Sequence, residues 1–306
     1  MAASWPPLSY GSWSPTCDTL HAHTQVLGKL AVELAAPEPQ LQHTALRLTA
    51  RGWETYPLPA PDGSGLITAA LDLRTHEAIV EHSDGSDARI ALTPDHAVAD
   101  VTRDVLDAVA ELGGAVAINP KPQEVVWDVP LDQDREHATY DPEQVAAYFA
   151  AAREAALVLA EFRAPFRGRS SPVNAWWGAF DLAVHLYSGR PAQPPSDDFI
   201  MRNSGDAEQF VIGWWPGDQR YGRAAFFAFA FPTPERFADA ELRPQQAHWD
   251  SGLGEFVLDW EDIRSEPDPH SLALEFARSA FRHACVVCAW DPLLASSAQG
   301  VPPPLR

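Results

Sequence analysis

Short runs of alternating apolar and polar residues recur along the chain, and this pattern limits the fold more than any other feature. The alternation predicts strands at 66–73, 77–82 and 88–92, with turns at Asp62-Gly63 and Asp84-Gly85. A parallel pair of strands needs a long crossover connection, and no helical pattern separates these runs. The sequence therefore predicts an antiparallel meander. The same alternation predicts earlier strands at 29–34 and 43–49.

Helical patterns flank the strands. Ser14-Pro15 fits the start of a first helix that Gly28 would end. Thr93-Pro94 opens a second helix, which the pair Gly113-Gly114 would stop, and a short strand is predicted at 115–119. The plan then repeats, with helices opened by Asp141-Pro142 and Asp268-Pro269 and with strands predicted at 174–187, 207–215, 223–231 and 254–260.

These elements predict an α+β fold made of two similar lobes of antiparallel sheet with flanking helices. Residues 119–136 are rich in Pro and Asp and have no clear period, which places the boundary between lobes 1–135 and 136–295. The Pro-rich tail 296–306 is predicted to be mobile. Thr24–Leu30 resembles Asn174–Phe180, each with glycine at its fifth position. This likeness indicates an internal repeat, and chance similarity is the rival explanation.

The charge of the chain argues against two classes of partner. Among 306 residues, 42 are acidic and 22 are basic, a formal net charge of -20. Nucleic acid and anionic membranes both bind cationic surfaces, so neither is expected as a partner. The longest apolar run, Ala224–Phe231, is far shorter than the roughly 20 residues of a membrane span. No secretion signal is recognised at the start, so the expected location is the cytoplasm.

Tryptophan is unusually frequent, with 11 residues that include the adjacent pairs Trp176-Trp177 and Trp214-Trp215. Neighbours on a strand point to opposite faces, so each pair sends one indole to each side of its sheet. One interpretation is a pocket lined by Trp176, Trp177 and Trp214, which would suit a flat or cationic ligand. The alternative is a sheet that is covered on both faces.

Two carboxylates lie among apolar neighbours on the predicted strands. Asp181 precedes an alternating run, and Glu208 precedes another with Phe210 and Ile212. Apolar surroundings raise the pKa of a carboxyl group, which suits a general acid or base. Alternatively, both residues lie at strand ends in water or pair with arginine.

Histidines offer a second kind of chemistry. His21, His43 and His137 are far apart in the sequence, and only folding could gather them around a metal. No H-x-x-H or H-E-x-x-H spacing is present, and Cys285 with Cys288 are too few for a structural zinc site. Glycine-rich phosphate loops and the G-x-S-x-G elbow are also missing.

Several motifs together carry a family resemblance that runs from Trp5 to about Trp290. The chain resembles the uncharacterised bacterial family catalogued as domain of unknown function 5996, as a divergent member. The matching stretches are 5–10, 19–21, 24–25, 28–29, 49–52, 137–142, 171–173, 177–178, 180–184, 213–217 and 253–256.

The resemblance implies motif positions at His21, Arg51, His137, Asp181 and Glu208. Relatives place histidine where this chain has Asn174, and a His-Glu pair where it has Ala207-Glu208. These departures weaken a metal-dependent interpretation for this chain.

The sequence favours a small-molecule enzyme with an aromatic-walled cleft between the lobes. A non-catalytic small-molecule binding protein is the first alternative, and a metal-dependent enzyme using His21, His43 and His137 is the second. No substrate, cofactor or oligomeric state is indicated. The proposed acid/base or proton-transferring residues are Glu208, Asp181, His21 and His137, and the proposed substrate-binding residues are Trp176, Trp177, Trp214, Asn174, Arg51 and Tyr140.

Overall fold

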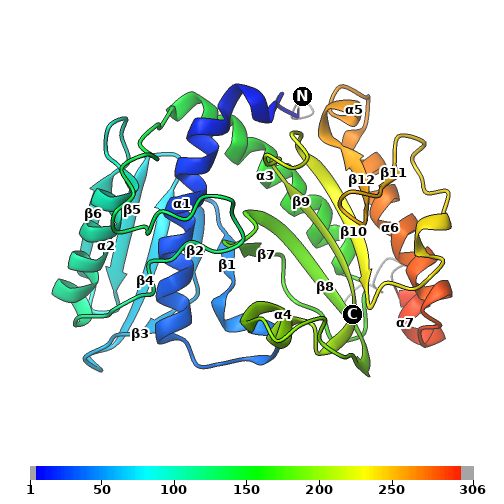
Figure 1. Cartoon of the computed structure of the whole chain (residues 1–306), viewed down its shortest axis with the longest axis horizontal. Helices are drawn as coiled ribbons and strands as arrows, with labels where there is room; N and C mark the ends of the chain where they lie inside the picture. The colour runs from blue at the N-terminus through cyan, green and yellow to red at the C-terminus, as the bar shows by residue number, and fades with distance from the viewer. Residues whose placement is uncertain (1–4, 298–306) are drawn as a thin grey trace, which may run out of the picture.

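The computed structural model describes residues 5–297 and has a mixed α+β fold (Figure 1). Its twelve strands form one antiparallel sheet in the order β11-β12-β10-β9-β8-β7-β1-β2-β4-β5-β6, with β3 paired to β4. The predicted antiparallel arrangement is therefore confirmed. The strands are β1 (Leu46–Leu48), β2 (Gly52–Thr55), β3 (Leu58–Pro59), β4 (Leu66–Asp72), β5 (Glu77–His82), β6 (Asp87–Ala91), β7 (Asn174–Trp176), β8 (Asp181–Pro191), β9 (Ala207–Trp215), β10 (Ala225–Phe231), β11 (His248–Asp250) and β12 (Glu255–Asp259).

Four long helices accompany the sheet, and shorter helical turns join the strands. Within the described residues, no helix is long and apolar enough to cross a membrane. The α-helices are α1 (Tyr10–Leu34), α2 (Val98–Gly113), α3 (Pro142–Arg163), α4 (Phe199–Ser204), α5 (Trp260–Ile263), α6 (Pro269–Val287) and α7 (Pro292–Ser297), and the 3-10 turns are η1 (Pro39–Thr44) and η2 (Phe237–Asp239).

The two predicted halves meet at the centre of the sheet, where β1 pairs with β7. Leu46 lies opposite Ala175, and Arg47 lies opposite Asn174. Along the chain, each half consists of a long helix, a set of antiparallel strands and a second long helix (Figure 1). The division into two lobes and the internal repeat remain predictions. Of the two segments compared in the sequence, 24–30 is helical, whereas 174–180 is a strand followed by a turn.

The long helices bury one face of the sheet. On β8, Leu182, Val184 and Leu186 are fully buried in the main core, with α3 packed against the strand. The same face continues into the N-terminal half, where Trp53 of β2 lies under α1 and donates its indole N–H to the Tyr148 hydroxyl of α3 at 3.0 Å. The long helices and the main core therefore cover the same face of the strands in both halves, but the sheet twists, so that α1 and α2 lie in front of the strands in Figure 1 whereas α3 and α6 lie behind them.

The first helix differs most from the prediction. It begins at Tyr10, contains Pro15, and continues through Gly28 to Leu34, so the predicted strand at 29–34 is wrong. Gly28 does not end the helix. A Cβ at this position would meet the Trp177 ring at about 2.1 Å, so glycine serves close packing inside the helix. Leu30 and Ala31 are buried there.

Other boundaries also shift. Residues 39–44 form a 3-10 turn, so the predicted strand at 43–49 is reduced to β1. A turn at 177–180 splits the predicted strand 174–187 into β7 and β8, and no strand forms at 115–119. In the predicted tail, Ser296 lies in α7, and 298–306 fall outside the described residues.

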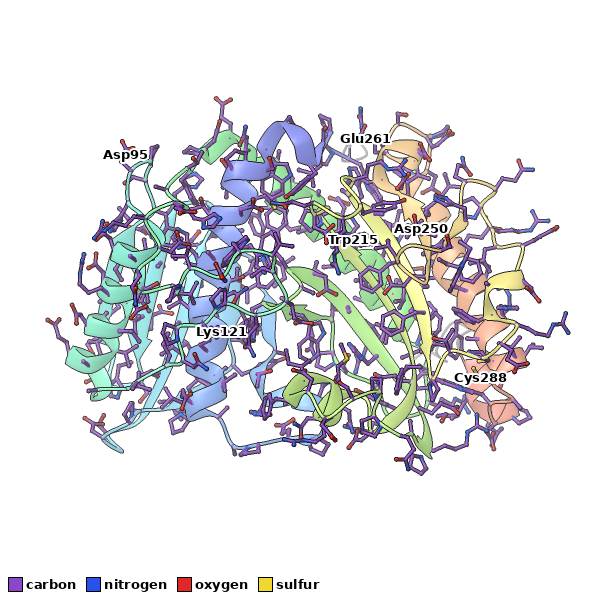
Figure 2. All side chains as sticks on the ribbon, in the orientation of Figure 1. Asp95, Lys121, Trp215, Asp250, Glu261 and Cys288 are labelled. Carbon is purple, nitrogen blue, oxygen red and sulfur yellow. The ribbon has the colours of Figure 1, made fainter. Side chains whose placement is uncertain are left out.

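The connection between α2 and α3 has no regular structure, as predicted, and it crosses α1 (Figure 1). Lys121, labelled in Figure 2, belongs to this segment. Two hydrogen bonds fix the segment to the helix: the Gln25 side-chain amide donates to Gln123 O, and Gln123 N–H donates to Gln25 Oε1, both at 2.9 Å. The neighbouring residue Glu124 is thereby held above the sheet centre.

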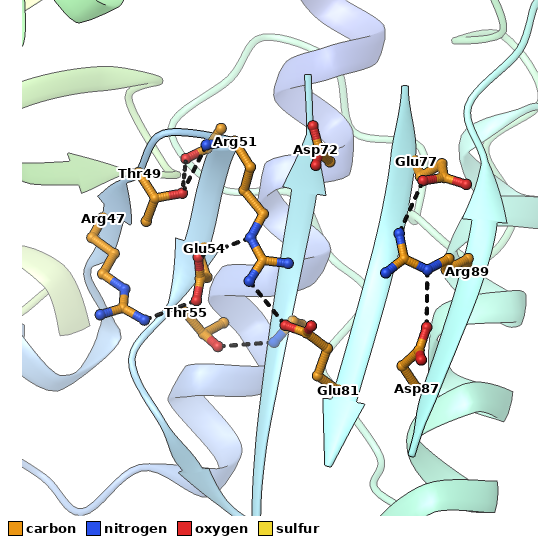
Figure 3. Close-up of polar contacts among 12 residues, drawn as sticks. Arg47, Thr49, Arg51, Glu54, Thr55, Asp72, Glu77, Glu81, Asp87 and Arg89 are labelled. Atoms are coloured by element: carbon orange, nitrogen blue, oxygen red, sulfur yellow. Dashed lines mark hydrogen bonds and ion pairs between the residues drawn. The ribbon is translucent and has the colours of Figure 1, made fainter. Parts of the chain in front are cut away.

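The opposite face of the sheet, called the open face, differs between the halves. In the N-terminal half it carries a network of ion pairs (Figure 3), in which Glu54 lies 2.8 Å from Arg47 and Glu81 lies 3.0 Å from Arg51. In the C-terminal half the same face carries aromatic side chains. Only the C-terminal half therefore offers an apolar floor to a ligand.

Candidate functional site

A cavity of about 930 Å³ lies on the open face of the C-terminal half of the sheet. Strands β8, β9, β10 and β12 form its floor. Helix α1, turn η1, helix α4 and the connection at 119–124 contribute to its walls. Trp215 and Asp250, which both line it, lie over this half of the sheet in Figure 2. Both predicted halves thus supply lining residues.

The floor of the cavity is aromatic. Trp215 and Phe227 contact edge to face with ring centroids 5.3 Å apart, and Phe229 stacks beside Phe227 at 6.3 Å. Gly213 lies opposite Phe227 in the strand register, and a Cβ there would meet the Phe227 ring at 2.3 Å. Glycine at this position therefore lets the ring lie flat against the sheet.

Asp181 is a buried acidic group of the cavity. It begins β8, lies opposite Trp176 on β7, and is only 7% exposed. Its Oδ1 atom has no hydrogen-bond partner. Burial raises the pKa of Asp181 well above its ordinary value, and the nearby charges of Glu124 and Glu255 raise it further. The carboxyl group of Asp181 is therefore easier to protonate than an ordinary aspartate.

Glu124 and Glu255 are the other acids near Asp181; the Glu124 side chain keeps access to solvent, and Glu255 is half-buried. Burial raises the pKa of Glu124 and raises that of Glu255 to about 7, and Arg220 partly opposes both shifts. A Cβ on Gly178 would lie 2.0 Å from the Glu124 carboxylate, so this carboxylate occupies the space that a side chain at position 178 would take. Two carboxyl groups with different proton affinities thus accompany Asp181.

The cationic side chains of the cavity have partners of their own. Lys29 Nζ lies 5.4 Å from the centroid of the Trp177 ring, and burial lowers the pKa of Lys29 to about 8. Arg220 pairs with Asp218 at 2.6 Å. Neither cation forms an ion pair with the three acids described above.

His185 lies on the same strand face as Asp181. Its Nδ1 contacts Gln209 Oε1 at 2.8 Å, and its ring meets that of Trp176 edge to face. Burial lowers the pKa of His185, so the imidazole is neutral at neutral pH. It offers the cavity a polar edge without a charge.

Three of the sequence-predicted site residues lie in this cavity, namely Asp181, Trp176 and Trp177. Trp177 is held by a hydrogen bond from its indole N–H to Thr44 O at 3.0 Å. The indole nitrogen of Trp176 is buried without a hydrogen-bond partner. These three residues come from β7, β8 and the turn between them.

The structure places the other predicted binding residues and Glu208 outside the cavity. Trp214 points to the opposite face and is fully buried in the core. The remaining residues have partners elsewhere: Glu208 pairs with Arg190, Arg51 with Glu54 and Glu81, Asn174 donates to Gln42 Oε1 at 2.9 Å, and Tyr140 contacts His76 at 3.1 Å.

The predicted histidines occupy separate positions. The Nε2–H of His21 donates to the carbonyls of Trp177 and Gly178 at 2.9 and 3.0 Å, and burial lowers the pKa of His21 to about 4. The Trp127 ring contacts both His21 and His137.

His137 pairs with Asp134 at 2.6 Å, which raises the pKa of His137. His43 Nδ1 accepts the backbone N–H of Glu38 at 3.0 Å. Within residues 5–297, no three His, Cys, Asp or Glu side chains are grouped so that they could hold a metal ion.

Sequence reasoning missed Glu124, Glu255 and His185. Glu124 lies in a segment without a period and has a positive φ of 59°, so local pattern could not place it. Glu255 shares a strand face with Val257 and Asp259, and the alternation of β12 would have placed it opposite the core.

The fold and this site together define a class: an α+β protein in which the open face of the sheet forms the floor of an aromatic cavity that contains a buried carboxyl group. The model described as "Family of unknown function (DUF5996)" matches residues 5–296, so the chain belongs to that family. The resemblance seen in the sequence is thereby confirmed. No curated protein and no solved structure matches the chain.

Proposed function

We propose that the chain is an enzyme that transfers protons on a small organic molecule bound in the cavity. The observation that carries the proposal is Asp181, a buried residue that lines a cavity of about 930 Å³ and whose Oδ1 atom has no hydrogen-bond partner. Buried polar groups are normally hydrogen-bonded, so an unpaired one in a cavity is a natural contact for a ligand.

Two carboxyl groups with different environments can divide the work of an acid and a base. Asp181, whose pKa is raised well above its ordinary value, would hold a proton and donate it to the substrate. Glu255, with a pKa of about 7, is present in both forms and would accept a proton. Trp176 and Phe227 would exclude water from the reacting groups.

Binding without catalysis is the alternative, and the predominantly aromatic floor favours it. Both functions need the cavity, so they differ only in whether the bound molecule changes. The roles predicted for Glu208, His21 and His137 receive no support from this site, because none of the three side chains lines the cavity.

A single experiment separates these functions. A chemically diverse pool of small molecules is incubated with the protein, binding is followed by ligand-observed NMR, and turnover is followed by mass spectrometry. An enzyme binds and depletes a compound, and Asp181→Asn still binds the compound but no longer depletes it. Binding without depletion by the unaltered protein would establish a binding protein. Absence of any binding would overturn the proposal.

A further inference from the structure

The ionisable side chains around the cavity are unbalanced in charge. Two are basic, Lys29 and Arg220, and both are engaged as described above. A negatively charged ligand would therefore meet repulsion from most sides. The acidic lining residues are Glu33, Glu124, Asp181, Asp250 and Glu255.

Three of these acids form no ion pair with a described residue, and Arg220 acts on Glu124 and Glu255 only by lowering their pKa values from a distance. The ion pairs and side-chain hydrogen bonds found within residues 5–297 do not include the carboxyl groups of Glu124, Asp181 or Glu255. Removing one partner from a buried polar group is costly, and supplying the missing partner recovers that cost. A ligand with N–H donors and a positive charge would supply the hydrogen-bond donor that the Asp181 carboxyl group lacks.

The aromatic floor favours the same charge. The faces of tryptophan, tyrosine and phenylalanine rings attract cations because the ring quadrupole is negative there. Trp176, Trp215, Tyr221 and Phe227 all line the cavity. Lys29 over Trp177 already shows this contact inside the protein.

We propose that the ligand of the cavity is an organic cation, an amine that is protonated at neutral pH and carries an apolar body. Its ammonium group donates hydrogen bonds to Asp181, with Glu124 and Glu255 nearby, and its body packs on Trp215 and Phe227. The proposal rests on the function proposed above, because it names the chemical class of the molecule held in the same cavity.

The experiment compares three probes that share one aromatic body and differ in charge. Phenethylamine is the cation, phenethyl alcohol is neutral and 3-phenylpropanoate is the anion. Isothermal titration calorimetry on the full chain at neutral pH is expected to rank them in that order of affinity. Hydrogen bonds to charged groups are the stronger ones, so the amine should bind at least about tenfold more tightly than the alcohol.

Variants test whether Asp181 carries this preference. Asp181→Asn should weaken phenethylamine about tenfold and leave phenethyl alcohol nearly unchanged, because an ammonium group beside Asp181 favours loss of its proton and pairs with the resulting carboxylate, which asparagine cannot form. Glu81→Gln is the matched control, since Glu81 lies on the same sheet face outside the cavity and pairs with Arg51. The control should leave all three affinities unchanged. If Asp181→Asn does not fold, Glu255→Gln should give the same selective loss.

The outcomes distinguish the two proposals. If phenethyl alcohol or 3-phenylpropanoate binds as tightly as phenethylamine, the cation is the wrong ligand class, although the cavity still binds small molecules. If none of the three binds to the folded protein, the assignment of a cation is refuted, and the chemically diverse pool described above then decides the proposed function. Equal weakening of all three probes by Asp181→Asn would show a structural role and would also overturn the assignment of a cation.

Discussion

Glu255 shows how strongly the cavity disfavours negative charge. Burial raises its pKa from an ordinary 4.5 to about 7, although Arg220 lowers it and Asp250 raises it further. Between these two values the folded state binds more protons than the unfolded state, so stability falls as the pH rises. At about 1.4 kcal/mol for each pH unit, the loss through this one group amounts to roughly 3 kcal/mol.

Replacing Glu255 with glutamine removes this titration while keeping the shape of the side chain. Glu255→Gln should therefore be more stable than the natural protein by up to roughly 3 kcal/mol above about pH 7, and the difference should vanish near about pH 4. Urea unfolding followed by tryptophan fluorescence at several pH values measures the free energy of unfolding directly.

An exposed glutamate provides the control for this measurement. Glu235 is exposed and makes no described contact, so Glu235→Gln should stay within about 0.5 kcal/mol of the natural protein at every pH. A difference between Glu255→Gln and the natural protein that does not change with pH would refute the reasoning. So would a Glu255→Gln variant that is less stable above about pH 7.

Three further changes test the packing around the site. Gly28→Ala should destabilise the protein by about 1–3 kcal/mol in thermal unfolding, because its methyl group meets an indole ring, whereas Gly11→Ala in the same helix has open space and should not. Trp53→Phe leaves the buried Tyr148 hydroxyl without its donor and should cost about 1–3 kcal/mol in urea unfolding. Asp141→Ala removes two N-cap hydrogen bonds from α3 and should lower stability by about 1 kcal/mol in the same assay.

The local sequence pattern predicted the structure correctly where that pattern lies within a single helix or strand. Strands β4, β5 and β6 follow the alternation closely, and Asp141 caps α3 as its sequence predicts. Gly28 was misjudged because its reason is a contact with Trp177, about 150 residues away in the chain. The sequence around Gly28 does not indicate that contact.

The same limit applies to the site. The sequence pattern predicted the same acid/base role for Asp181 and Glu208, since both precede alternating apolar runs. Asp181 lines a cavity, whereas Glu208 pairs with Arg190 in the irregular last part of β8. Whether a cation reaches a carboxylate depends on strand register and loop path, and the grouping of Glu124 with Glu255 depends on them as well.

The open sheet also has two ends, and both affect how molecules of this chain meet one another. Unpaired backbone groups on an edge strand invite pairing with another copy, which leads to fibres. At one end β6 exposes Asp87 and Arg89, which make an ion pair on the surface, and at the other end β11 is only three residues long. A sheet of twelve strands therefore presents neither edge as a template for its own continuation.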